Sequence, residues 1–315
     1  MQRLRLCVAS ALPKGLKTAW WLIKITVPVS FGVMLLDHFG ILAFMAQYTG
    51  PVFRHIGLPG VSAIVLVTSI FTNIYSVVAV LSMLHLPVRE GMILATMCLV
   101  SHGFLIETMV MKRTGSSAVR MLLLRLTGSV IIGWMLNLIM PGSISPDITS
   151  VIQKHESFSL ALMNWLNSIT HTTIKIILLV NLLLIFQRIL DEFGWIGAIE
   201  KPLNPLMKLF GLPRSTTLSW VVANLIGLAY GSAIMIDESE KGKMSRADAD
   251  LLNHHVSLSH SQLEDPLLFL TLGYAIHWLI WPRILIAIAA VWLRKAELKL
   301  YALSAGKRAL DQISR

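Results

Sequence analysis

Residues 36–60 read LDHFGILAFMAQYTGPVFRHIGLPG, and residues 190–214 read LDEFGWIGAIEKPLNPLMKLFGLPR. The two stretches are identical at 8 of 25 positions at a constant offset of 154 residues, including the Leu-Asp-x-Phe-Gly start and the Gly-Leu-Pro end. Unrelated segments would share far fewer positions, so the chain contains an internal repeat. An internal repeat in an apolar chain is typical of membrane transporters, which place their substrate site where the copies meet.

Polar residues repeat as well, at an offset that becomes 158 after a short insertion in the second copy. The matched positions are Ser101-His102 with Ser259-His260, Glu107 with Asp265, and Arg125 with Arg283. A helical unit duplicated for packing alone would not need a histidine, an acid and an arginine at matched positions. These residues are therefore the first candidates for a functional site.

Composition places the chain in a membrane. Its 315 residues are 55% hydrophobic and 14% charged, with a mean hydropathy of +0.69, whereas soluble domains contain about 25% charged residues. Several apolar runs approach the roughly 20 residues that cross a bilayer as a helix, and period-two strand patterns are not visible. We expect an all-α polytopic membrane protein with about eight to ten membrane segments, some of them short re-entrant or interfacial helices.

The charge of +10 gathers at the ends of the apolar runs. Basic residues before the first run and after the last predict that both termini are cytoplasmic, in a bacterial inner membrane. This basicity reflects topology and contact with membrane lipids rather than nucleic acid. Two cysteines exclude a disulfide framework and a Cys-based zinc site.

The copies define the domain organisation. We expect a first repeat over 1–140, a polar linker over 141–157, a second repeat over 158–295 and a basic cytoplasmic tail over 296–315. Positive charge in the loop 108–120, compared with a nearly neutral linker, favours an odd number of crossings per copy and thus inverted repeats. An even number would make the copies parallel.

Arg125 and Arg283 are the sharpest site candidates, since a charged side chain within an apolar span costs several kcal/mol. A guanidinium binds carboxylate or phosphate through a planar fork, so both residues are candidate ligands of an anionic substrate. The structural alternative is an ion pair with Glu107 or Asp265, or for Arg125 a side chain that reaches the interface.

The histidines form the second candidate pair. His260 and Glu264 stand four residues apart and would share a helix face, whereas His102 and Glu107 share one only if Gly103 breaks the helix. We expect His102 and His260 in substrate contact or a relay, and Glu107, Glu264 and Asp265 in proton or ion coupling. Polar packing and a metal site with His254, His255 and Asp250 are the alternatives. No metal is assigned.

Further polar residues complete the predicted site. Substrate-binding candidates beside the histidines and in the small-residue spans are Ser101, Ser259, Asn73 and Asn224. The segment 246–265 carries ten polar or ionisable side chains and cannot face lipid. It lines a polar cavity, is covered by protein, or lies outside the membrane.

The repeated pattern resembles tandem Gate domains, the nucleoside recognition family. Two copies of a span, Asp-x-Phe-Gly, Pro, Gly-Leu-Pro, a small-residue span and a Ser-His segment are similar to the paired spore-maturation membrane proteins, here fused from about 18 to 295. Related segments occur in concentrative nucleoside transporters and Feo-type iron transporters. The resemblance implies an inner-membrane transport role without fixing a substrate.

Function follows as an expectation. We expect an inner-membrane secondary transporter or flippase, without enzymatic activity or cofactor, whose substrate is a phosphorylated small molecule or a phosphate-headed lipid. Coupling to H⁺ or Na⁺ and a homodimer are open options. The alternatives are a cation-coupled nucleoside transporter, a divalent metal transporter, and a non-transporting membrane partner in envelope biogenesis. Phosphate-binding loops and nucleophile motifs are not found.

Overall fold

The computed structural model describes residues 2–84, 86–142, 157–225 and 227–313, and these are helical with no strands among them. The first repeat contains α1 (Gln2–His38), α2 (Ile41–Arg54), α3 (Ser62–Phe71), α4 (Ile74–Leu84), α5 (Val88–Ser101), α6 (Phe104–Arg113) and α7 (Ala118–Ile139). The second contains α8 (Phe158–Glu192), α9 (Trp195–Leu209), η2 (Arg214–Thr216), α10 (Thr217–Leu225), α11 (Leu228–Glu240), α12 (Arg246–Ser259), α13 (Glu264–Phe269), η3 (Leu270–Leu272) and α14 (Ile276–Ile313).

The two series correspond element by element. A long first helix is followed by a short one, α2 or α9, which begins directly after a left-handed glycine, Gly40 (φ 70°) or Gly194 (φ 65°). Glycine is the residue that adopts this conformation without steric cost, so the repeated Asp-x-Phe-Gly turn sets the same corner in both copies. Two helices broken near their middle come next, and a long last helix closes each copy.

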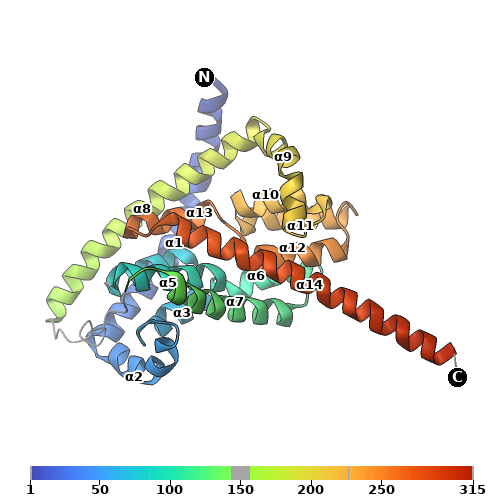
Figure 1. Ribbon diagram of the computed structural model, residues 1–315. Coiled ribbons are helices and arrows are strands. Elements are labelled where there is room, and N and C mark those ends of the chain that lie inside the picture. The colour runs from blue at the N-terminus through green and yellow to red at the C-terminus, as the bar shows by residue number, and fades with distance from the viewer. Residues whose placement is uncertain (1, 85, 143–156, 226, 314–315) are drawn as a thin grey trace.

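Equivalent helices run in opposite directions. α8 lies antiparallel along α1, and α14 antiparallel to α7 (Figure 1). Contacts agree with this view, because Trp165 near the start of α8 donates to Ser30 late in α1, while Arg120 at the start of α7 contacts Glu297 far along α14. The repeats are therefore inverted with respect to each other.

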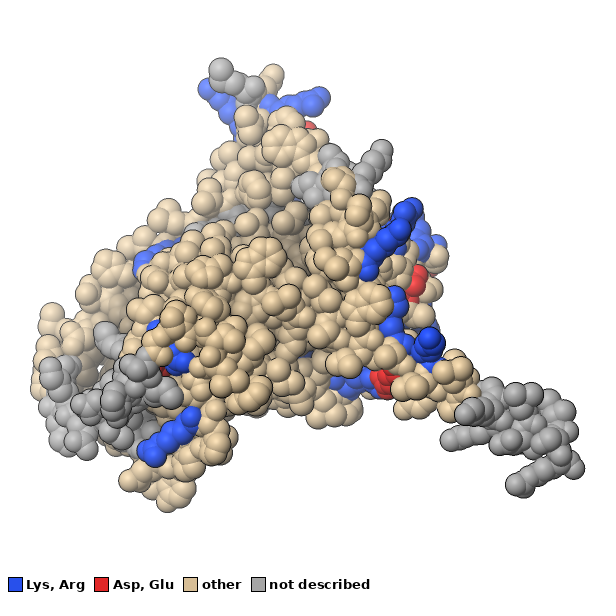
Figure 2. Space-filling view, viewed as in Figure 1, with Lys and Arg blue, Asp and Glu red and all other residues tan. Residues whose placement is uncertain are grey.

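Four helices are long and apolar enough to cross a membrane, namely α1, α7, α8 and α14, within the ranges described. A fifth span results if α5 and α6, which meet at a bend of 41°, are counted together. Two further apolar helices, α3 and α4, are shorter than a full membrane span. In the view of Figure 2, Lys and Arg side chains gather at the margins and a broad uncharged area lies between them. Exposed apolar side chains on α7 and α14, among them Leu138 and Leu285, suit contact with lipid.

Two predicted boundaries differ from the structure. The sequence also suggests an interfacial stretch over about 1–16 before the first span, whereas in the structure the two form one continuous helix, α1. The predicted tail over 296–315 does not begin at a break, because α14 continues from Ile276 to Ile313 without interruption. Lys and Ala residues within 294–302 are good helix formers and carry the helix past the apolar run. The second repeat begins with α8 at Phe158, and most of the predicted linker, 143–156, lies outside the described residues.

Candidate functional site

Each repeat contains a helix that breaks directly after its Ser-His pair. α5 ends at Ser101 and α6 begins at Phe104, with Gly103 between them at φ 58°. α12 ends at Ser259, and its turn residue Ser261 has φ 50°. Gly103 and Ser261 are equivalent at the 158 offset, so both copies turn at the same position, through a residue with positive φ. The condition for His102 and Glu107 to meet, a helix break at Gly103, is fulfilled.

A second broken helix meets each of these turns. The amide of Gly103 donates to the carbonyls of Ser69 and Thr72, both at 3.0 Å, at the gap between α3 and α4. The amide of Ser261 donates to Ala223 O at 3.0 Å, near the gap between α10 and α11. The breaks therefore satisfy one another's backbone groups, as backbone in a low-dielectric interior requires. Crossed discontinuous helices of this kind are the usual framework of transporter sites.

Arg125 and Arg283 bind the ends of the broken helices. Arg125 Nε donates to Val100 O at 2.9 Å, and its Nη2 donates to His102 O. Arg283 Nε donates to Leu258 O at 3.3 Å, and its Nη2 donates to His260 O. Both side chains are fully buried. A cation is favourable at a helix C-terminus, where carbonyls lack helical partners, so each guanidinium holds the turn that carries the histidine.

The two arginines differ in their carboxylate partner. Arg125 Nη2 lies 2.7 Å from Glu107 Oε2, a buried ion pair within the first copy. Among the described residues, no carboxylate oxygen lies within 4.0 Å of Arg283, and its Nη1 has no hydrogen-bond partner. The ion pair considered from the sequence is thus present for Arg125 and not for Arg283 with Asp265.

The histidines of the two copies face each other at the repeat interface. His102 Nε2 and His260 Nε2 are 3.3 Å apart. Glu107 Oε1 lies 3.1 Å from the first nitrogen and 3.2 Å from the second, and Asp265 Oδ2 lies 3.5 Å from His102 Nε2. We refer to His102, Glu107, His260 and Asp265 as the central cluster. All four side chains are buried or nearly so.

Hydrogen bonds fix the orientation of both rings. His102 Nδ1 lies 3.2 Å from Cys98 O, and His260 Nδ1 lies 2.8 Å from Val256 O. A carbonyl oxygen only accepts, so each Nδ1 carries a proton, and in the neutral form of each ring Nε2 directs its lone pair into the cluster. The carboxylates of Glu107 and Asp265 are acceptors as well. The central cluster therefore attracts positive charge, either as protons on Nε2 or as a bound cation.

Tyr75 joins the site from α4, although it is not among the site residues predicted from the sequence. Its hydroxyl donates to Glu264 Oε1 at 2.9 Å, next to Asp265. On the side of Tyr75 toward α8 lies a small cavity of about 30 Å³, whose lining includes Ser82, Thr172 and Lys175. Lys175, which also lines this cavity, is exposed at the surface. The polar position of Tyr75 within an apolar span was the available signal.

Four predicted residues bond elsewhere. Ser101 Oγ contacts Ser69 Oγ at 3.0 Å, and Ser259 Oγ contacts His255 Nδ1 at 2.7 Å. Asn73 Oδ1 accepts from the amide of Ser76 at 3.1 Å, and Asn224 Nδ2 donates to Trp220 O at 2.9 Å. These side chains stabilise the helix breaks and their packing, while the contacts described for the central cluster do not include them.

The expected shared helix face of His260 and Glu264 does not form. α12 ends at Ser259 and α13 begins only at Glu264, so the i, i+4 geometry of a regular helix does not apply across this turn. Glu264 turns to Tyr75, and Asp265 is the acid that approaches the histidines. From the sequence, Glu264 and Asp265 were both expected to take part in proton or ion coupling. In the structure the turn gives them different partners.

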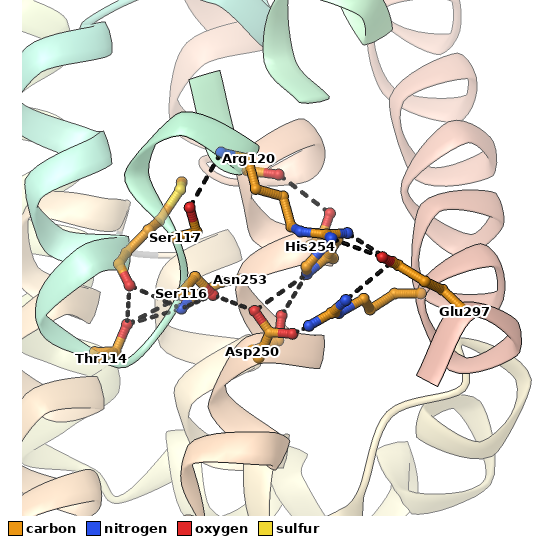
Figure 3. Close-up of polar contacts among 11 residues, drawn as sticks. Thr114, Ser116, Ser117, Arg120, Asp250, Asn253, His254 and Glu297 are labelled. Atoms are coloured by element: carbon orange, nitrogen blue, oxygen red, sulfur yellow. Dashed lines mark hydrogen bonds and ion pairs between the residues drawn. The ribbon is translucent and has the colours of Figure 1, made fainter. Parts of the chain in front are cut away.

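Most of the polar residues over 246–265 are covered by protein, since eight of the ten are buried and Asp248 and Glu264 are half-buried. Figure 3 shows a network around Asp250, whose Oδ1 accepts from Ser116 Oγ at 2.6 Å and whose Oδ2 accepts from Arg294 Nε at 2.8 Å. Its members are Thr114, Ser116, Arg120, Asp250, Asn253, His254, Arg294 and Glu297, which we call the end network. It joins the turn before α7 of the first copy to α12 and α14 of the second.

The histidines at 254 and 255 therefore do not gather with His260 around a metal. His254 Nδ1 contacts Asp250 O at 2.7 Å within the end network. His255 Nδ1 contacts Ser259 Oγ and the indole nitrogen of Trp220. Among the described residues, the group that could hold an ion is His102, His260 and Asp265, whose ligand atoms lie within 4.8 Å of one another.

Inverted repeats, apolar spanning helices and buried charges at the repeat interface define an all-α polytopic membrane protein. The chain is similar to the uncharacterized membrane protein YvoD of Bacillus subtilis (strain 168), with 29% identity over 286 residues that cover 89% of each chain. No protein-family model matches the chain, and no solved structure matches it. The similarity to YvoD spans both repeats and agrees with a multi-pass membrane protein.

Proposed function

We propose that this protein is a secondary transporter that exposes the central cluster alternately to the two sides of the membrane and moves positive charge with each cycle. The observation that carries the proposal is the meeting of two imidazoles and two carboxylates at 3.1–3.5 Å between inverted repeats. Ionisable residues inside a membrane are costly and usually serve a pathway or a relay.

The symmetry of the site favours transport over a purely structural role. Each repeat supplies one histidine and one acid on a broken helix, and the chain directions are reversed between copies. Inverted repeats allow one arrangement to open outward and its mirror arrangement to open inward around a fixed site. A non-transporting membrane partner would fill the same interface with apolar side chains at lower cost.

The contacts favour a cation over the anionic substrate expected from the sequence. Nε and Nη2 of both arginines are directed at backbone carbonyls, and Arg125 is also paired with Glu107. The groups that converge at the centre are acceptors. A phosphorylated molecule or phosphate-headed lipid stays a second candidate because Nη1 of both Arg125 and Arg283 is buried without a hydrogen-bond partner. A nucleoside, which the resemblance to Gate domains suggests, would be the solute driven by the cation.

The end network would be one of the gates. Arg120 of the first copy binds Glu297 at 2.6 and 2.7 Å, and Glu297 also binds Arg294 at 2.9 Å. These pairs tie α7 to α14 across the two repeats on one side of the central cluster. Access from that side requires the helices to separate.

Transport assays in liposomes test the proposal. Wild-type protein with an entrapped pH indicator should show H⁺ movement, or uptake of labelled metal ions, nucleosides or phosphate compounds, above protein-free liposomes. Glu107→Gln should reduce the flux at least about tenfold, while Asp237→Asn, at an exposed acid paired with Lys241, should keep it. Flux that is equal in wild type and Glu107→Gln would contradict the proposal.

Cross-linking tests the gate independently. Cysteines at positions 120 and 297, joined by a short bismaleimide, should block flux by holding α7 against α14. The same pair joined through a reducible linker should recover flux after reduction. Cys7 and Cys98 are buried, so the unmodified chain treated with the same reagents is the matched control. A cross-linked protein with full flux would exclude separation at this end.

A further inference from the structure

We propose that the central cluster binds one divalent first-row transition-metal ion through His102 Nε2, His260 Nε2 and Asp265 Oδ2, with Glu107 as an additional donor. The inference deepens the proposed function by naming the cation. Its role in transport rests on that function, but binding of the metal does not. Zn²⁺ and Co²⁺ are suitable probes for this class of ion.

The donor set selects this class of metal. Imidazole nitrogen suits Zn²⁺, Co²⁺, Ni²⁺ and Fe²⁺, and carboxylate oxygen completes such sites. Mg²⁺ and Ca²⁺ take oxygen ligands almost throughout, so two imidazoles count against them. Each ring donates its Nδ1 proton to a backbone carbonyl, which is the outer-shell arrangement that orients metal-binding histidines.

Distances among the donors match a metal site. Ligand atoms bound at about 2.0–2.1 Å in a tetrahedron lie about 3.3–3.4 Å apart. The two Nε2 atoms are 3.3 Å apart and His102 Nε2 is 3.5 Å from Asp265 Oδ2. The three ligand atoms come together within 4.8 Å. Small rotations of these side chains would therefore place an ion between them.

Charge balance supports a dication. Glu107 is neutralised by Arg125 at 2.7 Å. Asp265 Oδ2 is buried without a hydrogen-bond donor, and the adjacent Glu264 receives the hydroxyl of Tyr75. Among the described residues, neither Asp265 nor Glu264 has an Arg or Lys nitrogen within 4.0 Å. The ligand acid Asp265 therefore lies in a low-dielectric interior without an arginine or lysine partner, and a bound dication would supply the missing positive charge.

Metal binding to the purified full chain tests the inference. After chelator treatment, calorimetric titration with Zn²⁺ should give one site per chain, and Co²⁺ should give the visible absorption of a low-symmetry site with nitrogen ligands. His102→Gln, His260→Gln and Asp265→Asn should each weaken Zn²⁺ binding at least about tenfold. His277→Gln and Asp237→Asn, which alter an exposed histidine and an exposed acid, should bind as wild type.

The wild type provides a test that does not depend on variant folding. X-ray absorption at the zinc edge of the loaded protein should show two imidazole ligands with oxygen neighbours. A spectrum without imidazole, or equal Zn²⁺ affinity in folded His102→Gln and wild type, would overturn the inference. Zinc binding with this spectrum but without any flux in liposomes would sustain the metal site and overturn the transport proposal, so the two can fail separately.

Discussion

The arginines of the two repeats donate to equivalent backbone carbonyls but differ in their side-chain partners. Arg125 and Arg283 each hold two carbonyls at the end of a broken helix. Only Arg125 is paired with an acid, since Glu107 contacts it at 2.7 Å while Asp265 contacts His102. The duplicated role is to hold the turn, and the carboxylate is the part that differs between the copies.

This difference makes a symmetric framework into an asymmetric site. In the first copy the acid is neutralised, which leaves it to orient both imidazoles. In the second copy the acid has no arginine or lysine partner among the described residues and lies against His102 at the centre of the interface. The same sequence pattern thus supplies one ion pair, Arg125 with Glu107, and one acid without an arginine partner, Asp265. Double-mutant cycles can distinguish the two arrangements.

The largest expected effect is the loss of Arg125. Arg125→Ala should reduce the free energy of unfolding by roughly 3–5 kcal/mol, because Glu107 is left buried and unpaired. Adding Glu107→Ala should restore part of it, with a coupling energy of about 1–3 kcal/mol. The matched cycle of Arg283→Ala with Asp265→Ala should give a coupling below about 0.5 kcal/mol. Reversible unfolding in mixed micelles measures both.

Equal couplings in the two cycles would contradict the asymmetry. A large coupling between Arg283 and Asp265 would mean that these side chains pair in solution, as the sequence alternative held. Helicity by circular dichroism and elution in one peak are the controls that each variant is folded before its stability is compared.

The sequence predicted the repeat and the all-α membrane class, because identities at constant offset and long apolar runs are local signals, but it left open whether Arg125 is buried or reaches the interface. Partners across the interface were harder to predict. His102 meets His260 only because two chain segments 158 residues apart cross at their breaks. Ser261 gives no sign of a left-handed turn, since serine rarely adopts positive φ, so α12 was extended too far and Glu264 was grouped with His260.

The polar segment 246–265 shows a second limit. Its composition excluded contact with lipid, yet composition alone did not choose between a cavity and cover by protein. The choice depends on Ser116 and Arg294, which come from other helices and satisfy Asp250. The equivalent position in the first copy is Met92, which carries no carboxylate.

Asp250 tests the difference between the two ends of the molecule. Asp250→Ala removes the acceptor of Ser116 and Arg294 and should reduce stability by about 1–3 kcal/mol. Arg294 keeps Glu297 at 2.9 Å, which limits the loss. Met92→Ala is the matched change in the first copy, and its effect should not depend on salt because it removes no charge. If Asp250→Ala and Met92→Ala reduced stability equally and neither loss depended on salt, packing rather than the end network would stabilise this part of the molecule.

Exchange of the two turn residues tests the equivalence of the breaks. Gly103→Ser should cost about 1–2 kcal/mol, because a side chain at φ 58° is disfavoured. Its Cβ would also lie 3.1 Å from Glu107 Oε1. Ser261→Gly should be neutral or stabilising by up to about 1 kcal/mol. Thermal unfolding of both variants measures this, and a destabilising Ser261→Gly would show that the serine hydroxyl has a role of its own.

The smallest effect is expected for the outer pair of the end network. Arg120 and Glu297 are 38% and 30% exposed, so solvent screens their attraction, and Arg120→Met should cost about 0.2–1 kcal/mol. The loss should shrink as the salt concentration rises, because mobile ions compete with exposed charges. Lys241→Met, which breaks the more exposed pair with Asp237, is the control and should change stability even less. If the end network is a gate, α7 and α14 must separate there, and a weak, salt-sensitive ion pair allows this at little energetic cost. A loss above about 2 kcal/mol that does not respond to salt would place the pair among buried contacts and count against separation of α7 from α14.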